Sequence, residues 1–283
     1  PGTTRELIKF TEKHSGRDFG KGFGLAYVPD FVALGEVVHG FQYPDFVMTG
    51  TKNKKDLEIV SKVFENVHKN NPMIKNISIE EAEIAKVSFN AYVINKITFA
   101  NYLGMLCENL DNVNVKNITE TIGLSKRIAP SFFSAGTPWG GACYPRDITA
   151  FIEFSESRNV EPKHMFFAEE INKAVYSQLN KRGEAYSNIG ILGISFKPGT
   201  PVTTESPSLK LIEYFESANK DIKVYDKIDE VFNNFDTKNI EVFKNVQQCI
   251  DNSEIVYLMH RDKYFSEFDY EKVEVVDPWG LLT

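Results

Sequence analysis

The chain has 283 residues, of which 42% are hydrophobic and 25% charged, and its formal net charge is −7. A chain of this length can form two domains with separate cores, and its composition is that of an ordinary globular protein. The negative balance excludes a broad basic field for nucleic acid or anionic membranes, and no apolar run is long enough to span a bilayer. We therefore expect neither a nucleic-acid partner nor a membrane partner.

Cysteine and histidine usage excludes two further kinds of site. The three cysteines, Cys107, Cys143 and Cys249, include no CxxC pair, so we expect neither a disulfide framework nor a structural zinc site. The five histidines share no ligand spacing on a common helix, and we predict no metal. So few cysteines fit a reducing compartment, and we expect the protein in the cytoplasm.

Residues 1–78 have an α/β rhythm without a complete sheet, and the chain opens at Pro1 without an initiator Met. The expected elements are a helix over 3–14, strands at 22–29 and 46–50, a helix from about 54 to 69 and a strand at 74–78. We interpret this region as the tail of a domain whose front is absent from the chain.

Residues 79–109 predict one long helix, because the stretch has no Pro, no Gly before position 104 and many helix-forming residues. Its apolar residues cover more than one face, as in a helix that is buried on several sides. A helix of this kind usually joins domains or forms a dimer interface. Shorter helices are expected at about 114–123, 145–158 and 161–181, which complete a central dimerisation region over 79–183.

From residue 184 onward, strands alternate with helices, which predicts a doubly wound parallel sheet over 184–283. The expected strands are 188–196, 222–225, 240–243, 254–259 and 273–276, with a helix over 206–217. Ligands of such sheets bind at the carboxyl ends of the strands, and Lys197 follows the first strand. The predicted fold class is therefore α/β, with the tail of a first domain, a central long-helix region and a C-terminal doubly wound parallel sheet.

The segment Trp-Gly-Gly-Ala-Cys-Tyr-Pro-Arg-Asp at 139–147 carries the strongest chemical signal. Cys143 stands where a helix is predicted to begin, and Pro145 suits a first helical turn. A helix N-terminus stabilises a thiolate, so Cys143 is a candidate nucleophile. Asp147, four residues later, can share its helix face. The alternative is a Gly-Gly turn beside a buried cysteine that acts as a small hydrophobe.

Lys86 and Asn90 lie four residues apart on the long helix and so project from the same face. Two such donors can stabilise an oxyanion or hold an ordered water. The alternative is a lysine that reaches solvent and an asparagine that caps a neighbour. Asn101, about three turns after Asn90, is expected to form an interhelical hydrogen bond.

Taken together, these motifs resemble the UDP-glucose/GDP-mannose dehydrogenase family along essentially the whole chain. The matching segments are Lys86-x3-Asn90, Arg127-Ile128, 140–147, Phe196-Lys197-Pro198-Gly199-Thr200, Glu205-Ser206-Pro207 and 277–280. The resemblance implies an NAD-dependent four-electron oxidation of a nucleotide sugar, in which the C6 alcohol becomes a carboxylate. UDP-glucose, another UDP-hexose or a UDP-N-acetylhexosamine is the implied substrate, with mannose derivatives and GDP in place of UDP left open, and polysaccharide biosynthesis is the implied context. The resemblance further implies that residues 1–78 are the tail of an NAD-binding Rossmann domain, that the helix over 79–109 forms a homodimer, and that residues 184–283 are a nucleotide-sugar-binding, UDP-binding domain.

The resemblance also implies roles for individual residues. Cys143 would attack the aldehyde intermediate and form first a thiohemiacetal and then a thioester, with Lys86 and Asn90 as donors. Asp147 and Asp30 would be the catalytic carboxylates. The implied substrate-binding residues are Trp139, Gly140, Gly141, Phe196, Lys197 and, across a dimer, Arg127, and the implied cofactor-binding residue is Arg146.

Several positions depart from the family pattern. No Gly-x-Gly-x-x-Gly segment occurs, so we interpret the chain as N-terminally truncated and expect it to bind NAD poorly and to be inactive by itself. Leu34 stands where UDP-glucose enzymes carry a second Glu. Charged side chains of the family are replaced at three further positions, Val202, Thr204 and Trp279.

Two alternatives to the enzyme remain from other classes. A non-catalytic module for nucleotide binding or dimerisation would fit the missing cofactor segment, although Cys143, Lys86, Asn90 and Asp147 are all retained. A thiol hydrolase with a Cys–His pair is disfavoured, because no histidine accompanies the Cys143 motif.

Overall fold

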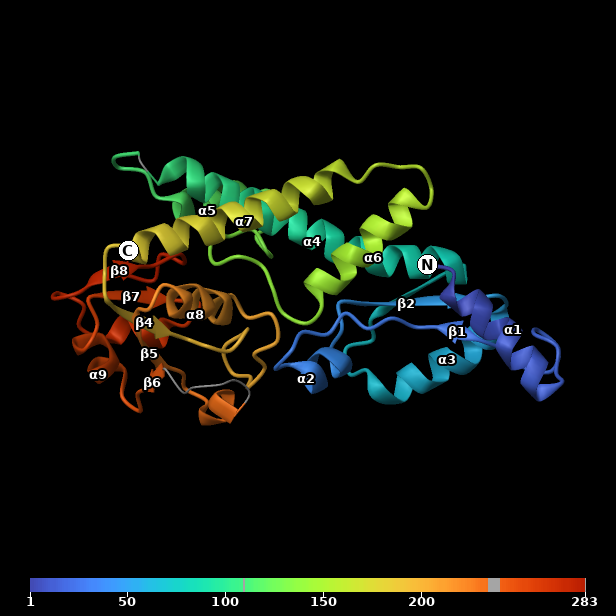
Figure 1. Cartoon of the computed structure of the whole chain (residues 1–283). Helices are drawn as coiled ribbons and strands as arrows, with labels where there is room; N and C mark the ends of the chain where they lie inside the picture. Colours follow the sequence, from blue (N-terminus) through green and yellow to red (C-terminus); the bar gives the residue numbers. More distant parts are fainter. Residues whose placement is uncertain (109, 234–239, 283) are drawn as a thin grey trace. The chain divides into compact units, whose positions relative to one another are not determined.

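A computed structural model describes residues 1–108, 110–233 and 240–282 and divides into two compact units, Pro1–Asn90 and Ala91–Thr283 (Figure 1). The long helix α4 (Ile79–Cys107) contributes residues to both units. It confirms the helix predicted over 79–109 as far as Cys107, and residue 109 lies outside the described residues. Within the described ranges, no helix combines the length and the apolarity that a bilayer crossing requires.

The first unit contains a three-stranded sheet. Its order is β1 (Ala26–Tyr27), β2 (Phe46–Thr51), β3 (Met73–Ile77), with β2 parallel to β3 and antiparallel to β1. The central strand β2 is buried along most of its length. It lies so close to the start of α4 that a Cβ on Gly50 would be 2.8 Å from the Cα of Ile79. The helices of this unit are α1 (Thr3–Ser15), α2 (Val37–Gln42) and α3 (Lys54–Val67).

Two details of this unit differ from the sequence prediction. The strand predicted over 22–29 is limited to Ala26–Tyr27, because Gly24 lies against the first turn of α3. A Cβ on Gly24 would be 2.0 Å from the carboxylate of Asp56, so the segment packs against a helix end instead of pairing along its length. The short helix α2 was not predicted, since Gly40 and two β-branched residues give it weak helix propensity.

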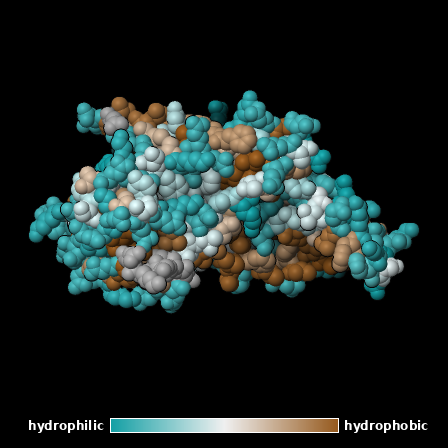
Figure 2. All heavy atoms as spheres, viewed as in Figure 1, coloured by the Kyte–Doolittle hydropathy of each residue, from teal (hydrophilic) through white to brown (hydrophobic). Residues whose placement is uncertain are grey.

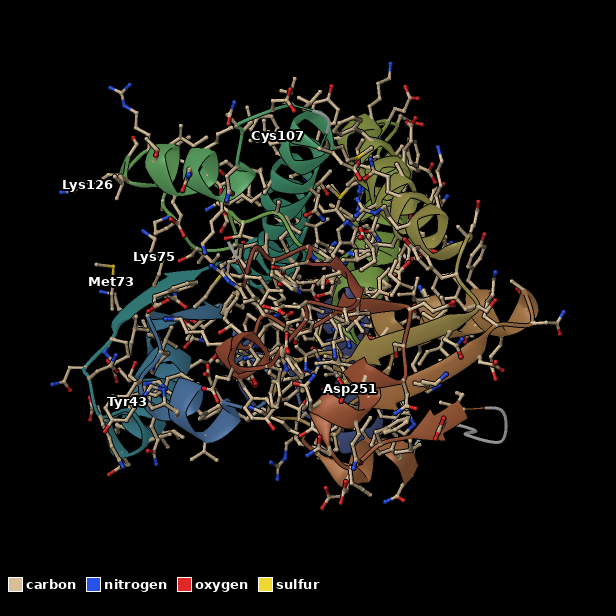
Figure 3. The ribbon with its side chains drawn as sticks, turned by 90° about the vertical axis from the view of Figure 1, so that its left-hand side faces the viewer. Tyr43, Met73, Lys75, Cys107, Lys126 and Asp251 are labelled. Atoms are coloured by element: carbon tan, nitrogen blue, oxygen red, sulfur yellow. The ribbon has the colours of Figure 1, made fainter. Side chains whose placement is uncertain are left out.

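The first unit also exposes large apolar side chains. Figure 2 shows hydrophobic atoms over the region of α2 and α3, where Val37, Val38, Ile59 and Val63 are 47–72% exposed. Met73 of β3 is 75% exposed, and its side chain points away from the ribbon in Figure 3. A surface of this kind is typical of an interaction face.

The second unit begins with a helical layer. The predicted central helices are confirmed, with slightly shifted ends, as α5 (Val115–Gly123), α6 (Tyr144–Glu156) and α7 (Lys163–Gly183). A small core joins three helices and contains Ala91 and Ile94 of α4, Ile148 of α6, and Met165 and Ala168 of α7.

A five-stranded parallel sheet follows, in the order β6-β5-β4-β7-β8. This confirms the predicted doubly wound sheet, whose topological switch point lies between β4 and β7. The strands are β4 (Asn188–Leu192), β5 (Asp221–Tyr225), β6 (Ile240–Val242), β7 (Ile255–Leu258) and β8 (Glu274–Val276). The connecting helices are α8 (Pro207–Ser217) and α9 (Val246–Asp251), with 3₁₀ turns at Asp229–Asn233 and Lys263–Glu267.

The sheet has a separate core on each face, because alternate residues of a strand point to opposite sides. Ile189 and Ile191 of β4 pack with Leu211 and Phe215 of α8, whereas Leu192 packs with the residues of α9. The two helices therefore cover opposite faces (Figure 1). The short helix α9 was not predicted from the sequence.

Strand β4 ends at Leu192, four residues before the predicted end. Gly193 has a φ of 92°, and a Cβ at this position would lie 2.4 Å from the ring of His260. The backbone therefore leaves the sheet at Gly193, passing directly beside the end of β7. The segment that follows is a loop at the carboxyl edge of the sheet, where a ligand would bind.

Candidate active site

Cys143 is the N-cap residue of α6, and its thiol is exposed and free. Pro145 lies in the first helical turn, where its missing N–H removes no helical hydrogen bond. The alternative of a buried cysteine is therefore wrong, and this sulfur is accessible to a ligand.

The side chain next to this thiol stays neutral. Burial, and to a smaller degree the charge of Cys143, raises the pKa of Tyr144 to about 12. The phenol keeps its proton at neutral pH and adds no negative charge beside the sulfur.

Asp147 lies one turn after Cys143 and is 6% exposed. Its backbone N–H donates to the carbonyl of Cys143 at 2.9 Å. Arg146 donates from Nε to Oδ1 of Asp147 at 2.9 Å, and this hydrogen bond, together with the charge of the carboxylate, raises the pKa of Arg146. The structure thus brings a nearly buried carboxylate within one turn of the exposed thiol. The cofactor role of Arg146 stays a prediction.

Two asparagines hold the loop that leads to Cys143. Asn101 of α4 accepts from Gly136 N–H at 2.9 Å and donates to the carbonyl of Thr137 at 3.3 Å. Asn172 of α7 accepts from Trp139 N–H at 2.8 Å and donates to its carbonyl at 3.0 Å. A side-chain amide can replace a peptide partner in both directions. The interhelical bond expected for Asn101 is therefore wrong, and Asn172 was not identified from the sequence.

The glycines of this loop lie against the segment that precedes α8. The N–H of Gly141 donates to the carbonyl of Glu205 at 3.0 Å, and a Cβ on Gly140 would be 2.2 Å from that same oxygen. A Cβ on Gly141 would lie 2.5 Å from the ring of Phe196. The structure thus brings Gly140, Gly141 and Phe196 together.

The loop after β4, which carries Phe196 and Lys197, is held at several backbone atoms. Asp226, directly after β5, accepts from Ile194 N–H at 2.7 Å and from Ser195 N–H at 3.0 Å. His260, after β7, donates from Nε2 to the carbonyl of Ser195 at 2.7 Å. Since one nitrogen donates in this bond, the Ser195 hydroxyl at 3.2 Å shares the same proton as a second acceptor.

Helix α8 adds two further bonds to this loop. The Ser206 hydroxyl donates to the carbonyl of Ile194 at 2.7 Å, and the Ser208 hydroxyl donates to that of Gly193 at 2.6 Å. The hydroxyl of Ser195 itself donates to the carbonyl of Lys197 at 3.0 Å. Four side chains from three other parts of the chain therefore fix the backbone at the ligand edge of the sheet.

Asp226, His260 and the serines of α8 were not singled out from the sequence. Asp226 and His260 each follow a buried apolar strand, and a polar residue in that position is the signal that could have indicated them. Burial lowers the pKa of His260, so the imidazole is neutral in the folded protein at pH 7.

Lys86, Asn90 and Asp30 belong to the first unit. The ammonium of Lys86 donates to the backbone carbonyl of Asp30 at 2.6 Å and lies 4.7 Å from the centre of the Phe31 ring. The structure thus brings two predicted catalytic residues together, through the main chain of Asp30 and not through its carboxylate. That these residues share one site with Cys143 and Asp147 of the second unit stays a prediction.

Arg127 lies in an exposed turn after α5. The neighbouring Lys126 projects away from the ribbon there, as Figure 3 shows. The contact of Arg127 with the substrate of a neighbouring subunit stays a prediction.

Trp279 takes a packing role at the position where the sequence suggested the loss of a charge. Its indole N–H donates to the carbonyl of Met259 at 3.1 Å, and a Cβ on Gly136 would lie 2.1 Å from its ring. Arg261 also reaches this loop and donates to Ser134 at 3.1 Å. The ends of β7 and β8 thus support the same loop that ends at Cys143.

This combination of a doubly wound parallel sheet with a cysteine loop packed along its carboxyl edge defines the fold of nucleotide-sugar dehydrogenases. Two profiles of the UDP-glucose/GDP-mannose dehydrogenase family match the sequence, the central domain at residues 80–174 and the UDP-binding domain at 190–279. The chain belongs to this family.

Individual relatives agree. The UDP-glucose 6-dehydrogenase AglM of Haloferax volcanii is 31% identical over 236 residues, which cover 81% of this chain and 55% of the relative. The UDP-glucose 6-dehydrogenase of Rickettsia bellii is 26% identical over 285 residues, which cover 96% of this chain and 64% of the relative. The chain thus spans less than two thirds of the length of these two curated relatives.

Solved structures resemble the chain in the same way. A UDP-glucose dehydrogenase from the archaeon Pyrobaculum islandicum has a TM-score of 0.84 at 26% identity, covering 92% of this chain and 61% of that one. A UDP-D-ManNAc dehydrogenase from Pyrococcus horikoshii has a TM-score of 0.81 at 20% identity, covering 100% and 67%, and shows the same fold.

Proposed function

We propose that the protein to which this chain belongs oxidises the C6 alcohol of a UDP-sugar to a carboxylate, with Cys143 as the nucleophile. The observation that carries this proposal is an exposed thiol at a helix N-terminus, one turn from the nearly buried Asp147. The loop that bears the thiol packs against Phe196 and Glu205 of the UDP-binding domain.

The chain's own residues would carry out the thiol chemistry. The thiolate of Cys143 attacks C6 of the aldehyde, a C–S bond forms and the carbonyl oxygen becomes an alkoxide. Lys86 and Asn90 are proposed to donate to this oxygen. After oxidation to the thioester, water attacks the acyl carbon, Asp147 accepts its proton and the thiolate leaves.

We propose NAD⁺ as the two-electron acceptor, as the family resemblance implies. A pyrophosphate of this kind is held by a Gly-x-Gly-x-x-Gly turn between a strand and a helix. No such sequence occurs in the 283 residues, so these residues do not fit the pyrophosphate of NAD⁺. The steps assigned to the chain are therefore substrate binding, nucleophilic attack and hydrolysis.

UDP-glucose is the first substrate to test, because the relatives described above carry its name. Leu34, at the position of a second Glu in UDP-glucose enzymes, favours a UDP-N-acetylhexosamine instead.

A homodimer through α4 is part of the proposal. Tyr92, Phe99 and Leu106 of this helix are 49–67% exposed, and an apolar face of this kind is typical of a subunit interface. Light scattering on the chain would detect a dimer, and a monomer at micromolar concentration would contradict this part.

The free state of all three cysteines supports a cytoplasmic, reducing location.

Turnover in the complete protein tests the main proposal. With UDP-glucose or UDP-N-acetylhexosamines and NAD⁺, we expect two NADH for each uronic acid, and Cys143→Ser should stop acid formation. The alternative, a non-catalytic module for nucleotide binding or dimerisation, predicts UDP binding without any reduction of NAD⁺. Acid formation that survives Cys143→Ser would exclude the proposed nucleophile.

A further inference from the structure

Lys96 of α4 is the centre of a cage of backbone oxygens. Its ammonium donates to the carbonyls of Ile128 and Ala129, each at 3.1 Å, and to that of Ser131 at 2.6 Å. An ammonium has three N–H donors, and these three bonds use all of them. No carboxylate of the described residues forms an ion pair with Lys96, so the partners of its ammonium in the turn of residues 128–131 are backbone carbonyl dipoles.

The turn needs such a partner because its backbone is strained. Ala129 and Phe132 have φ values of 61° and 60°, in the region that residues with a Cβ rarely adopt. The positive charge of the ammonium is attracted to the three carbonyl dipoles that point toward it, although these bonds are at exposed positions. The turn is followed by Phe133, whose side chain is 5% exposed. The ring of Phe133 stacks on the ring of Phe99, which belongs to the same helix α4 as Lys96.

Arg127 directly precedes this turn. The carbonyl of Ile128, the next residue, is one of the three oxygens on Lys96, and the N–H groups of Ile128 and Ala129 donate to the carbonyl of Ser125 at 3.0 and 2.8 Å. The guanidinium of Arg127 therefore extends from a backbone whose shape depends on the cage.

We infer that Lys96 is a positioning residue for Arg127: its ammonium occupies a three-carbonyl cation site and so sets the conformation from which Arg127 reaches a nucleotide sugar. The inference rests on the proposed function for the ligand of Arg127, but the cage is independent of it. If the side-chain ammonium is removed, we expect free NH₄⁺, which has the same N–H donors, to be able to take its place between the three carbonyls.

Two variants and a control separate the parts of this inference. Lys96→Ala empties the cage, Lys96→Met fills the same space without charge, and Lys163→Met removes an exposed lysine elsewhere in the second unit. Hydrogen exchange of the peptide spanning residues 125–133 reports the turn without any ligand. We expect at least ~10-fold faster exchange in both Lys96 variants and no change in the control.

Ammonium chloride should restore slow exchange in Lys96→Ala and not in Lys96→Met, whereas tetramethylammonium chloride at equal ionic strength should restore neither. An unchanged exchange rate in Lys96→Ala would contradict the claim that the ammonium holds the turn. An equal slowing of exchange by the two salts would contradict it as well. Global unfolding of a variant would appear as fast exchange in α7 as well, and Lys96→Arg, which keeps the charge, then supplies the comparison.

Binding of UDP-glucose to the complete protein tests the link to Arg127. We expect Lys96→Met and Arg127→Ala each to weaken binding by ~10-fold or more, and the double variant to be no weaker than Arg127→Ala. Additive losses would overturn the positioning role. A wild-type protein that binds no UDP-glucose would instead contradict the proposed function, while hydrogen exchange would still decide the cage.

Discussion

Gly141 lies against the ring of Phe196, with a φ of 78° and room for no side chain. The positive φ and the close contact with Phe196 both require glycine, and two variants can separate their effects on stability. Gly199 has a similar φ of 81° but no atom within 4 Å of its would-be Cβ. Gly199→Ala therefore introduces backbone strain alone, whereas Gly141→Ala adds a clash with Phe196.

We expect Gly199→Ala to lower the free energy of unfolding by about 1–2 kcal/mol. Gly141→Ala should lower it by roughly 1–3 kcal/mol more and should also weaken UDP binding. Urea unfolding and calorimetry measure the two effects. Equal losses in the two variants would mean that Phe196 moves aside freely.

Alkylation tests the accessibility of the nucleophile. Cys143 is exposed, Cys107 is half-buried and Cys249 is buried, and burial raises the pKa of the Cys249 thiol to about 12. We expect iodoacetamide to modify Cys143 first, as mass spectrometry of the peptides would show. Cys143→Ser should remove the fast phase and Cys107→Ser should leave it; the reverse result would contradict the accessible thiol.

Asp30 offers a test of main chain against side chain. Lys86 contacts the carbonyl oxygen of Asp30, so Asp30→Asn leaves this bond in place. If the carboxylate takes part in catalysis, Asp30→Asn lowers kcat of the complete protein by about 10²–10⁴-fold. A variant with normal kcat would limit the role of Asp30 to its backbone, while Lys86→Met should be impaired in either case.

His260 predicts a pH dependence of stability. Burial lowers the pKa of His260 in the folded state, so the unfolded chain, with an ordinary pKa near 6.5, binds the proton more readily. Stability contributed by the neutral imidazole is complete above this value and is lost as the pH falls below it. Asp226, Asp262 and Lys227 act on the same ring, the two carboxylates raising its pKa and the lysine lowering it.

We expect the free energy of unfolding to fall between pH 7.5 and 5.5, by at most about 1.4 kcal/mol per pH unit for this one proton. His260→Gln keeps a donor for the Ser195 carbonyl but does not titrate, and should flatten the slope. Urea unfolding at several pH values measures both. An unchanged slope in the variant would assign the pH dependence to other groups.

Asn172 and Asn180 form a matched pair on α7. Asn172 makes two hydrogen bonds to the backbone of Trp139, whereas Oδ1 of Asn180 is buried without a partner among the described residues. Asn172→Ala should lower the free energy of unfolding by about 1–3 kcal/mol, and Asn180→Ala should be nearly neutral. Similar losses in both would mean that the bonds to Trp139 contribute little.

The helices and the parallel sheet of the second unit could be predicted because their signals are local. Uninterrupted helix formers mark α4, and apolar runs that alternate with helical stretches mark β4, β5 and β7. The end of β4 could not be predicted in the same way. It depends on the contact between Gly193 and His260, which are 67 positions apart in the sequence and meet only in the folded sheet.

The residues of the candidate site also differ in whether their signal is local in the sequence or arises only in the fold. Cys143 and Asp147 are recognisable because a Gly-Gly pair, a proline and a carboxylate surround the thiol in sequence. Asn172 and Lys96 are single polar residues within long helices, and their sequence gives no sign of which backbone atoms they hold. Such residues are found only when the loop that they support is seen beside them.

The hydrogen bonds on the loop after β4 can form only in a certain order while the chain is being synthesised. Strand β4 leaves the ribosome before the side chains that fix its loop, which are supplied by α8, by Asp226 and last by His260. A nascent chain that stops short of residue 260 therefore contains the strand without the finished ligand edge, and translation of the β7 segment is the event that completes it.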